Sequence, residues 1–415
     1  MRDHTETANL PSRWLLLLLA LTCGVAVGNV YFPQAISPLV ATDLGVPSAT
    51  ATEVVTATQL GYATGIFLLV PLGDRLPHRP LIVGLLGLTG LGLLAAGLAP
   101  TVGLLIPAAA GVGTSTVVAP LIAVLAVGLV TEDRRGAATG ALLSGSIGGI
   151  LLARTFGGVL AEQYGWRTPY LVAAALTLVV ATLLAFVLPS TTAPSRDRYL
   201  ALLAQPLRLL RTEPDLRRSA FYQTMIFAGF SAVWTALALL LTGPTYGLGA
   251  QAVGLVALVS AVTMFCTPLV GARIDRRGPD PVNLASMLAT IAAAAVLALG
   301  GFGGATGLGA LVLGTLLLDV AMQAGMIANQ VRFFALRPDA RSRLNTAYMT
   351  CAYLGGSAGS WLGAQAYGTF GWAGPCAIVM VLAAAALTHH LRPRPVQVEH
   401  PAKQATTSCA PSRPS

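Results

Sequence analysis

Twelve apolar stretches, each close to the length that a helix needs to cross a lipid bilayer, dominate the sequence. About 20 apolar residues span the hydrocarbon core as a helix. Only 10% of the residues are charged, against about 25% in soluble domains. The sequence therefore predicts an all-α integral membrane protein with twelve transmembrane helices. The spans are expected near residues 14–36, 52–72, 80–98, 103–129, 136–159, 169–188, 219–241, 250–272, 282–301, 307–329, 344–366 and 373–391.

Basic residues are distributed unevenly between the two sides of these spans. The chain has 25 Lys and Arg residues. All of them except Arg154 and Arg167 fall in the termini or in the loops of one side. Because Lys and Arg concentrate on the cytoplasmic side of membrane proteins, both termini are expected in the cytoplasm. The net charge of +9 is then explained by orientation and does not indicate nucleic-acid binding.

The first half of the sequence is repeated in the second half. Residues 133–166 align with residues 339–372 at a constant offset of 206, without gaps. Two related six-helix halves are typical of secondary transporters. Leucines at helical spacing between arginines in the connecting stretch predict a short amphipathic helix on the membrane surface. We expect two pseudo-symmetric six-helix bundles at 14–188 and 219–391, a cytoplasmic linker at 189–218, a cytoplasmic tail at 1–13 and a disordered tail at 392–415.

The loops after the second and eighth spans carry similar charged motifs, LGDRLPHRP and ARIDRRGPD. With the repeated plan, they make residues 13–391 resemble the major facilitator superfamily, whose signature loop is G-x-L-a-D-R-x-G-R-K. The resemblance implies transport by alternating access. Such a loop can form ion pairs in one conformation and lose them in the other. A gating role is expected for Asp74, Arg75, Arg79, Asp275, Arg276 and Gly278, with Arg75, Arg79, Arg134 and Arg135 as partners of Asp74.

The fifth span contains a glycine-rich stretch, GALLSGSIGGILLARTFGG, at residues 140–158. Small residues three or four apart let a neighbouring helix approach closely. The stretch resembles the antiporter signature G-x8-G-x3-G-P-x2-G-G of the drug/proton antiporter branch, which implies export. Gly140, Gly149, Gly157 and Gly158 match, whereas Ala153 replaces a glycine and Arg154 replaces the proline. The second half keeps Gly355, Gly359 and Gly363 but has Ser360 at the position of Arg154.

Asp319 is the only acidic residue expected deep inside a span. An ionisable side chain at membrane depth is costly and is usually functional. Two interpretations stay open, a proton-coupling site and a structural hydrogen bond. A lipid-facing helix would not carry several polar residues on one face, so this face is expected to line a central cavity. It comprises Asp319, Met322, Gln323, Met326, Asn329, Gln330 and Phe333.

Arg154 allows three interpretations. It could bind an anionic substrate, serve as the counter-ion of Asp319 in proton coupling, or brace the packing of the bundle. Snorkelling to the outer surface is a further structural alternative. With the fifth span ending near residue 159, the two charges would differ in depth by about 10 Å at 1.5 Å per residue. The sequence therefore does not require a direct ion pair between Arg154 and Asp319.

Three other spans offer polar and aromatic side chains for the wall of a cavity. The resemblance implies substrate contacts on spans one, four, seven and ten. Pro33 is predicted to kink the first span near its outer end. For every candidate, packing or hydrogen bonding between helices is the alternative. The candidates are Asn29, Tyr31 and Gln34 on span one, Gln59 and Tyr62 on span two, and Gln223 and Trp234 on span seven.

Other classes of function lack their sequence signals. No Walker-type G-x-x-x-x-G-K-[ST] motif is present, which argues against ATP-driven export. The five cysteines show no metal-binding spacing, so we expect neither a metal nor a cofactor. We expect a proton-driven exporter of a small, partly apolar compound, working as a monomer in a bacterial inner membrane. An uptake permease and a membrane sensor without transport are the alternatives.

Overall fold

The computed structural model describes residues 13–131, 134–189, 198–337 and 340–392. The expectations made for the two tails and for residues 190–197 of the linker lie outside this part of the chain. The first half contains α1 (Arg13–Leu44), α2 (Ser48–Leu69), η1 (Val70–Asp74), α3 (His78–Gly97), α4 (Val102–Ser115), α5 (Val118–Leu129), α6 (Arg135–Tyr164) and α7 (Arg167–Val187). After α8 (Tyr199–Thr212), the second half contains α9 (Pro214–Thr242), α10 (Ala250–Val259), η3 (Ser260–Val262), α11 (Thr263–Arg277), α12 (Pro279–Ala298), η4 (Leu299–Phe302), α13 (Gly304–Phe334), α14 (Arg341–Phe370) and α15 (Ala373–Leu391).

The helices supply most of the predicted membrane spans. Within the described residues, ten helices or joined helix segments are long and apolar enough to cross a membrane. The bent pair of α10 and α11 is a further candidate. The remaining long helix, α14, has 30 residues and packs along α9 and α2 in the interior of the bundle. The predicted all-α multi-pass membrane fold is confirmed, with ten to eleven candidate spans among the described residues.

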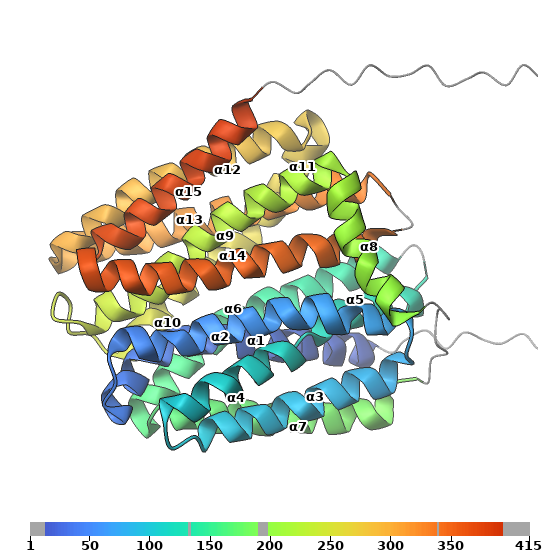
Figure 1. Ribbon diagram of the computed structural model, residues 1–415, viewed down its shortest axis with the longest axis horizontal. Helices are drawn as coiled ribbons and strands as arrows, with labels where there is room; N and C mark the ends of the chain where they lie inside the picture. The colour runs from blue at the N-terminus through green and yellow to red at the C-terminus, as the bar shows by residue number, and fades with distance from the viewer. Residues whose placement is uncertain (1–12, 132–133, 190–197, 338–339, 393–415) are drawn as a thin grey trace, which may run out of the picture.

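The two halves lie side by side (Figure 1). Helices α1 to α7 form one half and α9 to α15 the other, and α8 crosses between them at one end of the molecule. We call this end the α8 face. The halves meet along two seams, α2 against α14 and α6 against α10. At the first seam, Ser357 donates to the carbonyl of Thr56 at 3.0 Å; at the second, Thr155 donates to the carbonyl of Gly254 at 2.9 Å.

Two spans that were predicted to be continuous are interrupted. The fourth span divides into α4 and α5, because Pro120 has no N–H to donate to the carbonyl of Thr116. The Thr116 hydroxyl donates to the carbonyl of Ala26 at 2.7 Å, which ties this break to α1. The eighth span divides into α10 and α11 with a bend of 41°. There the chain passes through the short turn η3, and Pro268 within α11 removes one helical hydrogen bond.

Two spans are longer than predicted. Helix α1 continues to Leu44 and contains Pro33 in its interior, so the prediction that Pro33 lies near the outer end is wrong. Helix α6 continues to Tyr164 instead of ending near residue 159. As a result, Arg154 lies deeper in the bundle than the sequence indicated.

Glycine faces make close helix contacts in both halves. On α6, a Cβ atom at Gly149 would overlap the backbone of Gly24 on α1. On α14, a Cβ atom at Gly359 would overlap the backbone of Ala228 on α9. The absence of side chains thus lets α1 approach α6 and lets α9 approach α14. The same relation holds for Gly145 against Ala20, Gly355 against Thr224 and Gly363 against Ala232.

Helix α8 occupies the part of the linker where an amphipathic helix was predicted. Its side chains Leu202 and Leu209 are buried. At its start, the hydroxyl of Tyr199 donates to the carbonyl of Leu68 in the first half at 2.6 Å. Just beyond its end, Glu213 forms an ion pair with Arg337 of the second half at 3.1 Å. Helix α8 is therefore attached to both halves.

The glycine faces predict a position-dependent effect of a single methyl group. We expect Gly149→Ala and Gly359→Ala to lower the melting temperature of the purified protein, because the added Cβ meets backbone atoms that cannot move independently. Gly140→Ala is the matched control, since open space surrounds that position and alanine is favoured over glycine in a helix by about 1 kcal/mol. Thermal unfolding checks this, and equal melting temperatures for Gly140→Ala and Gly149→Ala would contradict it.

Candidate functional site

A cavity lies between the two halves, beside α1, α6, α9 and α13. It has a volume of about 60 Å³ and is partly open, which is smaller than a typical site for a whole drug-sized molecule. Most of its wall is apolar, and the charged groups on it are one arginine and one aspartate. The lining residues are Tyr31, Ile147, Ile150, Leu151, Arg154, Phe230, Ser260, Thr263, Asp319, Met322 and Gln323.

The side chain of Arg154 is buried and held in one orientation. Only 2% of the residue is exposed, which rules out snorkelling to the surface. Its Nε and Nη2 atoms donate to Oε1 of Gln34 at 3.2 and 2.7 Å. Its Cζ lies 4.0 Å from the ring centroid of Trp234, 5.1 Å from that of Tyr31 and 5.7 Å from that of Phe230. Three aromatic rings and one amide therefore hold the guanidinium.

Asp319 contacts the edge of the same indole ring. The residue is 6% exposed, and its Oδ1 accepts a hydrogen bond from Nε1 of Trp234 at 3.0 Å. Trp234 thus contacts the cation through its ring and the carboxylate through its N–H. The described residues contain no direct ion pair between Arg154 and Asp319. The two charges share one cavity and are connected through Trp234.

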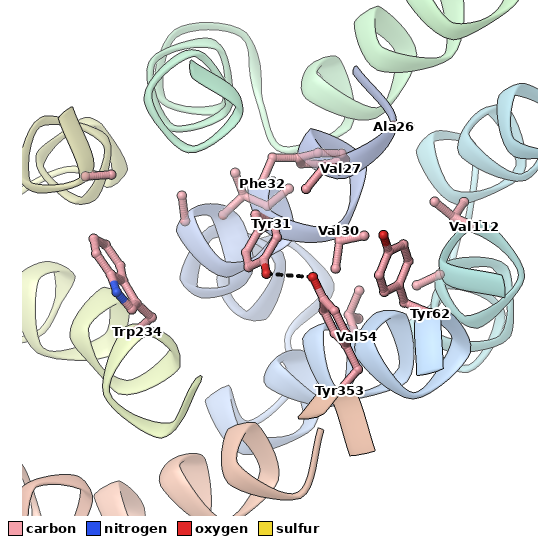
Figure 2. Close-up of a cluster of buried hydrophobic side chains, with 14 of the residues drawn as sticks. Ala26, Val27, Val30, Tyr31, Phe32, Val54, Tyr62, Val112, Trp234 and Tyr353 are labelled. Atoms are coloured by element: carbon pink, nitrogen blue, oxygen red, sulfur yellow. Dashed lines mark hydrogen bonds between the residues drawn. The ribbon is translucent and has the colours of Figure 1, made fainter. Parts of the chain in front are cut away.

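Tyrosines from both halves close one side of this arrangement (Figure 2). The hydroxyls of Tyr31 and Tyr353 point toward each other and lie 3.0 Å apart. Tyr62 packs edge-on against Tyr353, with ring centroids 4.5 Å apart, so it supports Tyr353 and does not line the cavity. The contact between Tyr31 and Tyr353 joins α1 to α14 and therefore crosses between the halves.

The predicted polar face of α13 is divided between two environments. Asp319, Met322 and Gln323 line the cavity. Nearer the α8 face, Met326 packs against a separate apolar cluster, and Asn329 is buried beside Tyr348 of α14. Gln330 is not among the residues that line the cavity. The face continues as one stripe along α13, but α14 covers its second part.

Most of the other predicted candidates form hydrogen bonds between helices. Asn29 donates to Thr177 at 3.3 Å, and Gln59 accepts from Ser231 at 3.3 Å. The amide oxygen of Gln223 accepts from the hydroxyl of Tyr348 at 2.9 Å. Gln34 differs from these residues because its partner is the charged side chain of Arg154.

The cavity includes residues that the sequence reasoning missed. Ser260 and Thr263 line it because the interruption between α10 and α11 places both hydroxyls at its wall. The sequence offered one signal for these two residues, namely that both carry hydroxyl groups and precede Pro268 in an apolar span. Ile147, Ile150 and Leu151 on α6 are also in the wall. Their apolar side chains gave no indication of which face of the span would meet a cavity.

The charged loop after α2 connects the two halves at the α8 face. Asp74 lies 3.9 Å from Arg343 of α14 in the second half, a partner that the sequence did not indicate. Arg79 donates to the carbonyl of Ala185 on α7, and Arg75 is exposed. Because this ion pair joins the two halves, it can form only when the two bundles are close together at this face.

The corresponding loop of the second half has different contacts. Asp275 and Arg276 are exposed on the last turn of α11. Gly278 ends that helix with a φ of 76°, a conformation that favours glycine. The acidic residue that forms an ion pair here is Asp280, whose partner is Arg332 of α13. Within the described residues, no group of three or more His, Cys, Asp or Glu side chains is arranged to hold a metal ion.

Comparisons with known proteins agree with this architecture. The sequence matches the profile of the Major Facilitator Superfamily over residues 16–360 and 225–414. It is 34% identical over 362 residues to the putative uncharacterized transporter YgaY of Escherichia coli (strain K12), covering 87% of this chain and 91% of that protein. It is 24% identical over 166 residues to the multidrug resistance protein MdtG of Dickeya zeae (strain Ech586), covering 39% of this chain and 40% of that protein.

Among solved structures, the crystal structure of a mutant of the nucleoside transporter NupG has a TM-score of 0.71. The match covers 91% of this chain and 97% of that chain at 12% identity, which indicates a shared fold. The profile match extends over most of the chain, and the similarity to YgaY extends over nearly all of that relative. The chain therefore belongs to the major facilitator superfamily, as a multi-pass membrane transporter and not an enzyme.

Proposed function

We propose that this protein is a proton-coupled secondary transporter of a small, partly apolar organic compound, and that Asp319 carries the coupling proton. The observation that carries this proposal is the position of Asp319. It is a buried carboxylate on the wall of the cavity between the halves. Ionisable groups at membrane depth are costly and are concentrated on transport and proton pathways.

The surroundings of Asp319 provide a means of proton exchange. Its negative charge is stabilised by the N–H of Trp234 at 3.0 Å and by Arg154, which lies over that ring. Trp234 belongs to the second half and Arg154 to the first. A movement of one half against the other changes the distance between Arg154 and Asp319. The affinity of Asp319 for a proton would then differ between the two conformations of an alternating-access cycle.

The seams between the halves support a two-sided cycle. Helices α6 and α10 are in contact between the cavity and the end opposite the α8 face, where the N–H of Ala250 donates to Glu162 at 2.6 Å. At the α8 face, Asp74 and Arg343 form an ion pair between the halves. The distribution of basic residues supports a cytoplasmic α8 face, with both termini in the cytoplasm of a bacterium and the protein in its inner membrane. A single chain contains the whole cavity, which supports a functional monomer.

Export is the proposed direction. The stretch from Gly140 to Gly158 resembles an antiporter signature, and its glycine face packs on α1 in the structure. The partial similarity to a multidrug resistance protein supports the same direction. Uptake is the second candidate, and a specific observation favours it. A proton on Asp319 would leave Arg154 as an uncompensated cation in the cavity, which would retain an anionic solute together with the proton.

Flux in oriented vesicles tests both the coupling and the direction. We expect Asp319→Asn to abolish transport driven by a pH gradient, because the amide cannot take up and release a proton, while substrate binding is retained. The measurement is accumulation of labelled substrate in inside-out vesicles with an imposed pH gradient. Accumulation there supports export, whereas accumulation confined to right-side-out vesicles supports uptake. Unchanged coupling in Asp319→Asn would remove Asp319 from the mechanism, and Asp43→Asn, in an exposed ion pair with Arg167, is a control for loss of a carboxylate outside the cavity.

The ion pair at the α8 face predicts a separation of rate from affinity. We expect Asp74→Asn and Arg343→Gln each to lower the transport rate with little change in substrate affinity. The reason is that the pair contributes to the stability of one conformation and does not line the cavity. Initial rates and equilibrium binding of the same variants provide the measurement. A collapse of affinity at a normal exchange rate would contradict the gating role.

A further inference from the structure

We propose that the substrate of this cavity is an organic anion, with a carboxylate as the best match, bound at the free edge of the Arg154 guanidinium. The inference rests on the proposed transport function of the same cavity and adds the chemical class of its ligand. Three observations lead to it: the unused donors of Arg154, the aromatic rings that Arg154 already occupies, and the balance of charge with Asp319.

Arg154 has donors left for a ligand. Nε and Nη2 are directed at the oxygen of Gln34, which is fully buried and fixes the plane of the guanidinium. Nη1 makes no hydrogen bond to any residue that the structure describes, and Arg154 lines the cavity. A planar guanidinium with its donors held in place suits a carboxylate better than a point charge does.

The cavity is poorly suited to an organic cation. Aromatic faces are the usual binding surface for such cations. Here the rings of Tyr31, Phe230 and Trp234 already surround the guanidinium. A cationic ligand would have to displace Arg154 from these rings or lie beside a fixed positive charge. The positive charge of Arg154 therefore excludes cationic ligands from these rings.

The charges around Asp319 link anion binding to the proton. With Asp319 ionised, its charge balances that of Arg154, and an added anion would leave the cavity negative. With Asp319 protonated, an anion on Arg154 restores neutrality. The titratable groups that face this pair from other helices are Tyr31 on α1 and Tyr353 on α14, and Ser260 and Trp234 complete the polar neighbours. The proton and the anion are thus expected to bind to the same state of the cavity.

The remaining wall defines the rest of the ligand. Ile147, Ile150, Leu151 and Met322 form an apolar surface next to Arg154. The cavity measures about 60 Å³ and is partly open, so the part of the ligand held beside Arg154 is a small group such as a carboxylate. The expected ligand is a monocarboxylate with an apolar body.

Matched probes test the charge preference directly. Purified full-length protein is incubated with benzoate, benzylamine and benzyl alcohol, and with the carboxylate, amine and alcohol that share a 4-phenylbutyl skeleton. Thermal unfolding and equilibrium binding are measured. We expect the carboxylates to raise the melting temperature more than the amines or alcohols of the same skeleton. Arg154→Gln should weaken carboxylate binding by roughly 10–100-fold, the value of a hydrogen bond to a charged group.

Two further variants separate binding from folding and from coupling. Arg154→Lys keeps the positive charge and is expected to retain part of the carboxylate binding even where Arg154→Gln is unstable. Arg167→Gln, which breaks an exposed ion pair with Asp43, is the matched control and should bind carboxylates normally. In the unmodified protein, carboxylate affinity should fall as the pH rises and Asp319 loses its proton, whereas in Asp319→Asn the affinity should stay high and independent of pH.

Several outcomes would overturn the inference. Preferential stabilisation by the amines, carboxylate binding that persists unchanged in Arg154→Gln, or a panel in which no carboxylate binds would each do so. Failure of the transport proposal is distinguishable from these results. If carboxylates bind through Arg154 but flux in Asp319→Asn still follows the pH gradient, the ligand class stands and the proton site is elsewhere.

Discussion

The burial of the Arg154 guanidinium is the interaction on which the arrangement of the interior depends. A bare arginine at the centre of a bilayer costs at least about 2.5 kcal/mol. Here Gln34 on α1, Trp234 and Phe230 on α9 and the nearby Asp319 on α13 surround the charge. These residues come from both halves. The same contacts that make the buried charge tolerable therefore connect the two halves around the cavity.

Close helix packing makes this set of contacts possible. Gly149 lets α1 approach α6 until Gln34 reaches Arg154 further along the same helix pair. The equivalent helix pair in the second half is built in the same way around Gly359. There Ser360, at the position of Arg154, shares a hydrogen bond of 2.9 Å with Thr235. The same helix packing therefore holds a charged residue in the first half and a neutral hydrogen bond in the second. The cavity is chemically asymmetric although the two halves share one backbone plan.

The sequence was sufficient for the features that follow from local pattern. The spans, the amphipathic character of α8 and the glycine faces depend on spacing along one helix, and so does the position of Asp319 on a polar face. The interruptions at Thr116 and Ser260 were not predicted, because a proline within an apolar run can either be tolerated or end a helix. The role of Trp234 between Arg154 and Asp319 was also not predictable. It depends on the rotation of three helices, and each residue alone fits ordinary packing.

The attachment of α8 at both ends has a mechanical consequence. With 14 residues at 1.5 Å per residue, the helix is about 21 Å long. Tyr199 holds its start to the first bundle, and its end continues through Glu213 into the second. A helix under tension does not stretch appreciably without breaking its own hydrogen bonds. While both attachments persist, α8 therefore acts as a connector of fixed length. It limits how far the two bundles can separate on this face.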